Sequence, residues 1–294
     1  MSRTRPSDLV LRAWLGLFFV YLFLPLIVMA AATFNASRFP TVTPWTGTTL
    51  QWFGELWADQ RMWEGLRSSI LVGVAVIALA VPIGTAAALL LDGLHGRART
   101  LIYAAMVSPL LTPGVIIGIS TLVFWNRLGV GPGLHLVVLG QTSFIAAYVM
   151  LLVLARLQRF DRSLEEAALD LGASHAQAFR RVLLPHLMPA LGAAAVLAFF
   201  QSFENFNTTI FLRGVDNTVT VYIASKVRTG LTPAVNALGL ILIVLTVIGA
   251  VIYEVLRRRE ARAEAAARRR AAEAEGALDA GSGLQMGALA ATQS

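Results

Sequence analysis

The sequence contains no cysteine. This absence excludes disulfide frameworks, zinc sites with thiolate ligands, iron–sulfur clusters and cysteine nucleophiles. Charged residues are also scarce, at 14% of 294 residues, whereas a soluble domain carries roughly 25%. Because so few charges cannot cover a water-facing surface, the composition excludes an ordinary soluble enzyme.

The chain also lacks the features of an ATPase, a metalloprotein or a nucleic-acid-binding protein. It has no phosphate-binding G-x-x-x-x-G-K-[S/T] loop, so ATP hydrolysis by this chain is not expected. Its histidines are scattered without ligand spacing, at His95, His135, His175 and His186. Of the 24 basic residues all but Lys226 are arginines, and they flank apolar segments rather than forming a stripe with aromatics. We therefore predict no catalytic residue, no cofactor or metal site in this chain, and no nucleic-acid partner.

Apolar residues dominate instead, at 56% of the chain, with a mean hydropathy of +0.68. About 20 apolar residues are needed to cross roughly 30 Å of hydrocarbon as a helix. Six charge-free intervals are long enough: residues 13–37, 68–91, 100–126, 128–155, 182–203 and 229–253. The shorter interval 39–54 is rich in Thr, Pro and Gly, which predicts a loop. The sequence therefore predicts an all-α integral membrane protein with six transmembrane helices.

Arginine placement predicts the orientation, because basic residues accumulate on the cytoplasmic side. If the N-terminus is cytoplasmic, 17 basic residues lie inside and seven outside, so both termini should be cytoplasmic. Three alanines follow the first apolar run, as at a signal-peptide cleavage site, but the run is long and five spans follow, which favours an uncleaved anchor. The predicted segments are a cytoplasmic N-terminus (1–12), the first span (13–34), an outer loop (35–65), a domain of spans two to six (66–257) and a cytoplasmic tail (258–294) that is disordered towards its end.

The inner segment between spans four and five carries the clearest local signals. Ser163-Leu164-Glu165-Glu166 predicts a capping box, and Leu171 then shares a helical face with Leu164. Gly172 suits the left-handed position that ends a helix. Ser174-His175-Ala176-Gln177 predicts a second capping box. Two short helices should therefore meet at an angle over Gly172.

These residues also resemble a known family pattern. Glu166-Ala167-Ala168, three residues, Gly172, nine residues and Val182-Leu183-Leu184-Pro185 are similar to the EAA loop of permease subunits of binding-protein-dependent ATP-binding-cassette (ABC) importers. The only departure is Val182, where the family has isoleucine. Residues 153–157, 202–206 and 230–238 resemble the spermidine/putrescine branch, and the similarity covers most of residues 66–258.

The resemblance implies a type I importer permease fold in which residues 66–257 form the transmembrane domain and residues 157–186 the coupling loop. It assigns ATPase coupling to Glu166, Ala167, Ala168, Gly172, Leu184 and Pro185. An alternative is that Glu166 only caps its own helix. The implied partners are a second permease, identical or homologous, around which span one wraps, two ATPase subunits that bind ATP and Mg, and an external substrate-binding protein. The implied location is the bacterial cytoplasmic membrane.

Two features suggest a substrate path. Pro109 and Pro113 should kink or break the third span, which in transporters often exposes carbonyls to a solute, although a packing kink is an equal alternative. Glu204 in the outer half of span five is costly facing lipid, and it should form a polar strip at helical spacing with Gln201, Asn205 and Thr208. In polyamine permeases Asn205 corresponds to a second acid. A small organic cation is favoured as the solute, and a structural carboxylate is the alternative for Glu204.

An ATP-independent secondary transporter or channel is the alternative function, and a membrane-embedded enzyme is a third. A secondary transporter predicts ion-coupling charges in several spans and an inverted repeat, but the sequence shows one intramembrane acid and no repeat. A membrane-embedded enzyme requires converging His, Asp or Glu residues, which are absent from the predicted spans.

Overall fold

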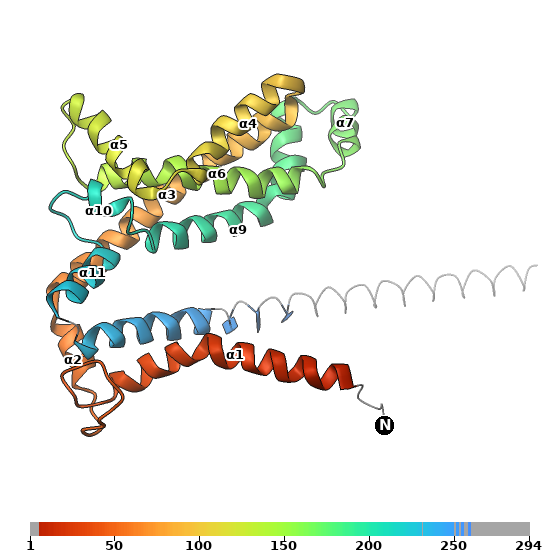
Figure 1. Cartoon of the computed structure of the whole chain (residues 1–294). Helices are drawn as coiled ribbons and strands as arrows, with labels where there is room; N and C mark the ends of the chain where they lie inside the picture. The colour runs from red at the N-terminus through yellow and green to blue at the C-terminus, as the bar shows by residue number, and fades with distance from the viewer. Residues whose placement is uncertain (1–5, 231, 250, 253, 256–257, 260–294) are drawn as a thin grey trace, which may run out of the picture. The chain divides into compact units, whose positions relative to one another are not determined.

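The computed structural model describes residues 6–230, 232–249, 251–252, 254–255 and 258–259. Within these residues the regular elements are helices. One isolated β-bridge pairs Asn35 with Thr48 in the segment between the first two helices. The chain divides into two compact units (Figure 1), one made of Met1–Phe53 with Asn236–Ser294 and the other of Gly54–Val235.

The first unit contains the N-terminal helix α1 (Pro6–Thr33). Its large side chains over residues 10–28 are exposed on every side, as in a helix whose surroundings are lipid or a partner. Near its end Met29 lies against Gly239 of the apolar helix Pro233–Gly249, where a Cβ would come within 3.2 Å of the methionine sulfur. A small residue therefore permits this close approach.

The loop predicted at residues 39–54 is confirmed up to residue 50. The buried Asn35 organises it, because its amide nitrogen donates to two loop carbonyls at 2.9 and 3.0 Å. Helix α2 (Gln51–Ala58) follows, within the residues 35–65 for which the sequence predicts only a loop. The buried Trp52 side chain, which donates to the Asn35 carbonyl at 2.7 Å, holds its first turn in place.

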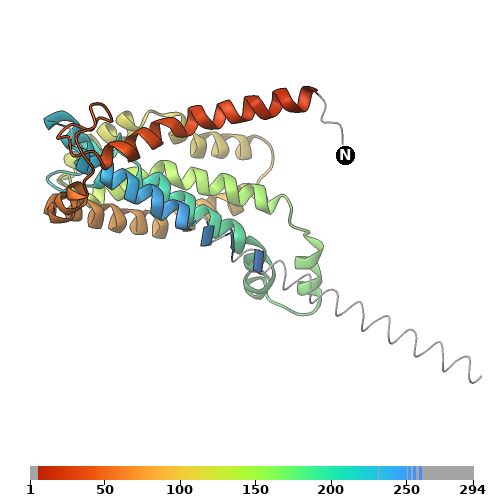
Figure 2. The same ribbon diagram turned by 90° about the horizontal axis from the view of Figure 1, so that it is seen from below.

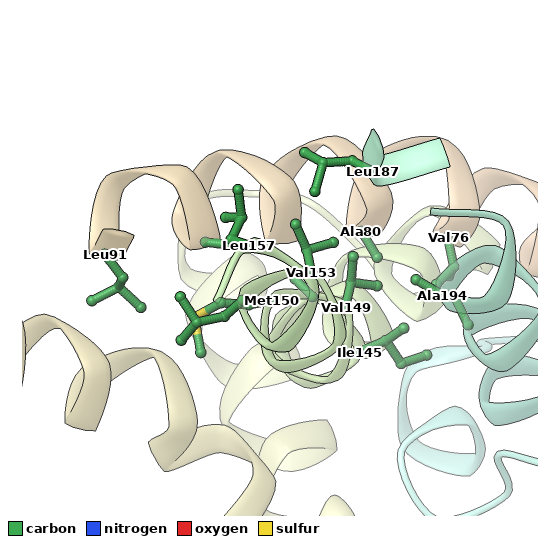
Figure 3. Close-up of a cluster of buried hydrophobic side chains, with 14 of the residues drawn as sticks. Val76, Ala80, Leu91, Ile145, Val149, Met150, Val153, Leu157, Leu187 and Ala194 are labelled. Atoms are coloured by element: carbon green, nitrogen blue, oxygen red, sulfur yellow. The ribbon is translucent and has the colours of Figure 1, made fainter. Parts of the chain in front are cut away.

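The second unit is built on three long helices, α3 (Gln60–Gly93), α6 (Leu134–Leu157) and α9 (Leu184–Phe203). Gly84 lets α3 and α6 approach, since a Cβ there would lie 2.5 Å from the Ala146 carbonyl oxygen. Figure 3 shows the buried side chains between the helices, among them Val76, Ala80, Leu91, Ile145, Val149, Met150, Val153, Leu157, Leu187 and Ala194. Interdigitated apolar side chains and small residues stabilise this helix bundle.

Helix α3 begins eight residues before its charge-free interval because Asp59 caps it. The carboxylate accepts from the N–H of Arg61 at 3.0 Å, and it also binds helix α11 (Val219–Thr229) through Tyr222 at 2.9 Å and Lys226 at 2.8 Å. Burial raises the pKa of Asp59, but the hydrogen bonds from Lys226 and Tyr222 and the lysine charge outweigh it and hold that pKa below its usual value. Burial, reinforced by Asp59, raises the pKa of the Tyr222 phenol, which remains a donor. These contacts attach α11 to the start of α3.

The third predicted span is broken into α4 (Gly96–Leu111) and α5 (Gly114–Arg127), whose axes differ by 104°. Pro113 lies at the junction as the N-cap of α5, and Pro109 lies inside α4. The predicted break is therefore confirmed, and proline is its local cause because it lacks the N–H that continues a helix.

Four described helices are long and apolar enough to cross a membrane, or five if the bent α4–α5 pair is one span. The sixth interval contains the helix Pro233–Gly249, which is shorter within the described residues. The count of six and the orientation of the termini stay predictions. The predicted tail lies almost wholly outside the described residues.

Candidate functional site

The predicted coupling loop, residues 157–186, projects from one end of the second unit, opposite the end that carries α10 (Thr209–Leu212) and α11 (Figures 1 and 2). It contains helix α7 (Ser163–Asp170), helix α8 (His175–Ala178) and the π-helix Phe179–Leu183, which leads into α9. Two short helices separated by a turn confirm the predicted architecture of this segment.

The start of α7 differs from the prediction. The Asp161 carboxylate accepts from the N–H of Ser163 at 3.0 Å, so the predicted capping box of Ser163 with Glu166 is wrong. Asp161 takes the Ser163 N–H that the predicted box assigns to Glu166, and α7 begins with Arg162 as its N-cap. The Glu166 N–H therefore bonds the Arg162 carbonyl at 3.1 Å instead of the serine hydroxyl. Hydrogen bonds from the Ser163 hydroxyl and N–H hold the pKa of Asp161 below its usual value.

The turn between the two helices is as predicted. Gly172 has a φ of +84°, and its N–H donates to the Leu169 carbonyl at 2.9 Å while Ala173 donates to Ala168 at 3.0 Å. This pair of bonds is the Schellman ending of a helix. Next, Ser174 and Gln177 form the predicted second capping box, with bonds of 2.9 and 3.3 Å. The bend of the loop is thus determined by its own residues.

The loop is fastened to the bundle at its base. Arg156 donates to the His186 carbonyl at 3.0 Å, and the His186 ring nitrogen lies 3.3 Å from the Arg156 carbonyl. The Phe160 ring packs on His186 with centroids 5.1 Å apart. A salt bridge of 2.7 Å joins Arg162 to Asp92 at the end of α3. These contacts connect the loop to α3, α6 and α9.

The outward surface of the loop exposes two leucines among its charged residues. Leu171 is 89% exposed and Leu164 55% exposed. The sequence predicts that these leucines share a helical face, but its periodicity does not show whether that face is buried or exposed. A groove of about 330 Å³ lies beside them, lined by Ala168, Leu171, Gly172, Ala173, Gln177, Ala178, Arg181 and Val182. Within the described residues the exposed Glu166 carboxylate has no hydrogen bond or salt bridge. The loop thus exposes leucines and a free acid on its surface.

The residues at the loop exit lie where the pattern places them. The N–H of Leu184 donates to the Phe179 carbonyl across the wide π-turn, and Pro185 follows in the first turn of α9. Leu184 is half-buried and Pro185 is exposed. π-turns often occur at functional sites. Here the π-helix Phe179–Leu183 forms the junction between the loop and α9.

The predicted polar strip in span five is wrong in its geometry. It required a helix through Thr208, but α9 ends at Phe203 and Glu204 is its C-cap. The cause is Asn205, whose side-chain oxygen accepts from the N–H of Thr208 at 3.1 Å and so favours a new start, helix α10. Asparagine competes with the helix for backbone donors in this way.

The strip residues therefore separate. Thr208 is buried and its hydroxyl donates to the Gly114 carbonyl at 3.1 Å, where α10 packs on α5. Gln201 is half-buried. Glu204 is exposed, and in the described part of the chain its side chain has no hydrogen bond or ion pair. The structure leaves one free carboxylate at the end of α9.

Side-chain hydroxyls satisfy two carbonyls beside the break in the third span, and a role of Pro109 and Pro113 in a substrate path stays a prediction. The Ser108 hydroxyl donates to the Ala105 carbonyl at 2.9 Å, the bond that Pro109 cannot make. The Thr112 hydroxyl donates to the Ser108 carbonyl at 3.0 Å. Serine and threonine commonly satisfy carbonyls at such breaks. Among the described residues no three His, Cys, Asp or Glu side chains cluster as metal ligands.

The chain is similar to known proteins over most of its length. Residues 4–262 match the family described as "Binding-protein-dependent transport system inner membrane component". The chain is 33% identical over 252 residues to the putrescine transport system permease protein PotI of Escherichia coli strain K12, covering 82% of this chain and 89% of that protein. It is 30% identical over 241 residues to the spermidine/putrescine transport system permease protein PotC of the same strain, covering 82% and 90%.

Among solved structures, the fold is similar to a chain of the bacterial alginate ABC transporter in complex with its alginate pentasaccharide-bound periplasmic protein. The TM-score is 0.65 with 16% sequence identity, over 82% of this chain and 91% of that chain.

Proposed function

The chain belongs to the family of binding-protein-dependent transport system inner membrane components, and from that premise we propose that it imports a small organic cation of the polyamine type, driven by a partner ATPase. It is a permease subunit of a binding-protein-dependent ABC importer. The observation that carries the coupling proposal is the loop: Glu166, Ala167, Ala168 and Gly172 form a rigid bent segment that is fastened to three long helices.

The proposed mechanism follows from that attachment. The ATPase binds the exposed face of α7, with Leu171 and Leu164 in apolar contacts and Glu166 paired with a basic group. Leu184 and Pro185 set the direction in which the loop joins α9. ATP and Mg bind to the ATPase, and this chain supplies the moving helices. Since α6 and α9 are joined through Arg156 and His186, they move together with the loop.

The remaining partners and the location are also proposals. The solute is delivered by an external substrate-binding protein and passes between this subunit and a second permease, identical or homologous. The assembly includes two ATPase subunits and lies in the bacterial cytoplasmic membrane. The relatives named for putrescine and spermidine transport and the free carboxylate of Glu204 support a cationic solute, because a carboxylate compensates its charge in a low-dielectric site.

Co-purification and reconstituted transport test this function together. A tagged chain, extracted in mild detergent from its own host, is expected to bring down an ATPase and a second permease identifiable by mass spectrometry. The purified complex in liposomes, supplied with its binding protein, should accumulate radiolabelled putrescine only when ATP is present. A chain that purifies without an ATPase and transports in response to an ion gradient would instead support a secondary transporter.

The predicted orientation can be tested because the chain has no cysteine of its own. Val215 is 99% exposed on the predicted outer side, and His95 is exposed in the predicted inner turn between α3 and α4. In intact cells a membrane-impermeant maleimide should label Val215→Cys and leave His95→Cys unlabelled until the cells are permeabilised. The unsubstituted chain is the blank. The reverse pattern would put the coupling loop outside and contradict ATPase docking.

A further inference from the structure

The segment of residues 204–208, between α9 and α10, is not helical. By the predicted topology it lies in the outer half of the membrane. Backbone groups at that depth have no water to bond, so a non-helical segment requires partners from the protein itself. Nearby residues supply most of these partners, among them the Asn205 side chain and the Thr209 hydroxyl. A side chain from the distant helix α6 bonds the hydroxyls on both flanks of the segment.

Gln141 in the middle of α6 is the centre of these contacts. It is 1% exposed, and both ends of its amide are occupied. The nitrogen donates to the Thr209 hydroxyl at 2.9 Å, and the oxygen accepts from the Ser202 hydroxyl at 2.5 Å. A buried amide is costly unless it is paired, and here one side chain joins the last turn of α9 to the first turn of α10.

The network continues into the backbone next to Glu204. The Thr209 hydroxyl, which accepts from Gln141, donates in turn to the Asn205 carbonyl at 2.7 Å. That carbonyl also accepts from the Thr220 hydroxyl of α11 at 3.2 Å. The Ser202 hydroxyl therefore donates to Gln141, whereas the Thr209 hydroxyl accepts from Gln141 and donates to Asn205. Asn205 is held through both its carbonyl and its side chain, and Glu204 is the residue before it.

The backbone of α6 is shaped for this contact as well. Gly140, next to Gln141, faces α10, and a Cβ there would lie 2.5 Å from a Leu212 methyl and 3.2 Å from the Thr208 methyl. The absence of a side chain at position 140 therefore permits the approach that brings the Gln141 amide within reach of Thr209.

We infer that Gln141 is a positioning residue for the substrate path: through Ser202 and Thr209 it fixes both ends of the segment that presents the Glu204 carboxylate. This inference rests on the proposed function, in which Glu204 meets the cationic solute. Gln141 does not contact the solute itself. It determines where the carboxylate lies relative to the path, and hence how well a cation is bound there during transport.

The test compares variants of the complete importer in liposomes, with radiolabelled putrescine delivered by its binding protein. Gln141→Met keeps the length of the side chain and removes both hydrogen-bonding groups. Because a displacement of about 1 Å can cost up to roughly 100-fold in a positioned site, we expect uptake to fall about tenfold. Gln141→Glu in its protonated form keeps one donor and one acceptor and should restore most of the uptake.

A triple variant separates positioning from stability. Gln141→Met with Ser202→Ala and Thr209→Val leaves no polar group of the trio unpaired, so its thermal midpoint in detergent should return towards that of the unsubstituted chain. Its uptake should remain low, because the segment has lost its attachment. If uptake recovers together with the thermal midpoint, Gln141 serves only stability and the inference is wrong.

The failure of this inference can be told from the failure of the proposed function. If Glu204→Gln transports putrescine normally, the proposed path is wrong. If Glu204→Gln lowers uptake but Gln141→Met and the triple variant do not, the path stands and the positioning role is wrong. If the path through Glu204 and the positioning role of Gln141 are both correct, adding Gln141→Met to Glu204→Gln should cause little further loss of uptake. The two residues then act through one carboxylate.

Discussion

The Gly172→Val variant is expected to enter the membrane at the normal level and to lose ATP-driven uptake. Gly172 has a φ of +84° and no heavy atom within 4 Å of its missing Cβ. The cost of a side chain there is therefore conformational, about 1–2 kcal/mol for a β-carbon in the left-handed region. Valine should relieve that strain by opening the turn between α7 and α8, which moves the docking surface away from the ATPase.

Matched substitutions test whether the backbone conformation of Gly172 is the cause of the lost uptake. Gly93→Val, also on the predicted inner side and also without heavy atoms within 4 Å of its Cβ position, should keep uptake because its φ is not in the left-handed region. Gly172→Asn should retain much of it, since asparagine tolerates that region. Uptake and ATPase co-purification are the measurements.

Glu166→Lys tests the same surface through charge. The carboxylate is exposed and has no partner among the described residues, so the substitution should leave the subunit folded while repelling a basic group on the ATPase. Glu166→Gln isolates the loss of charge from its reversal. If Gly172→Val and Glu166→Lys both transport at the normal rate, the loop does not couple the ATPase to the membrane helices.

Glu204→Gln is expected to lower uptake of a cationic solute by roughly tenfold to 100-fold, the equivalent of about 1.5–3 kcal/mol for a lost charged contact. The affinity of the binding protein for the solute and the basal ATPase rate should not change, because Glu204 takes part in neither. Uptake in liposomes, calorimetry on the binding protein and ATPase assays measure the three quantities.

Glu64→Gln is the matched control for Glu204. Glu64 is an exposed carboxylate on the predicted outer side, near the start of α3. Its removal should leave uptake unchanged. Undiminished uptake in Glu204→Gln would make Glu204 a structural carboxylate and remove the residue-level argument for a cation.

Asn205→Asp adds the second acid found in polyamine permeases while keeping the acceptor for Thr208. This variant should increase uptake of spermidine relative to putrescine.

The sequence alone was sufficient for features that neighbouring residues determine. The turn at Gly172 and the capping box of Ser174 with Gln177 depend on residues within five positions of one another. The break at Pro113 follows from one ring and one missing N–H. Long apolar runs require helices because a membrane satisfies no backbone groups. Such signals are local, and the chain carries them wherever it folds.

Tertiary structure decided what depends on residues far apart. Periodicity placed Leu171 on a helical face but did not reveal that the face is left exposed. The attachment of both flanks of the segment after α9 to α6 depends on Gln141, which is 61 residues from Ser202 and 68 from Thr209. Asp59 meets Tyr222 across 163 residues. A polar side chain in an apolar span shows in the sequence that a partner is needed, but only the packing of the helices selects the partner.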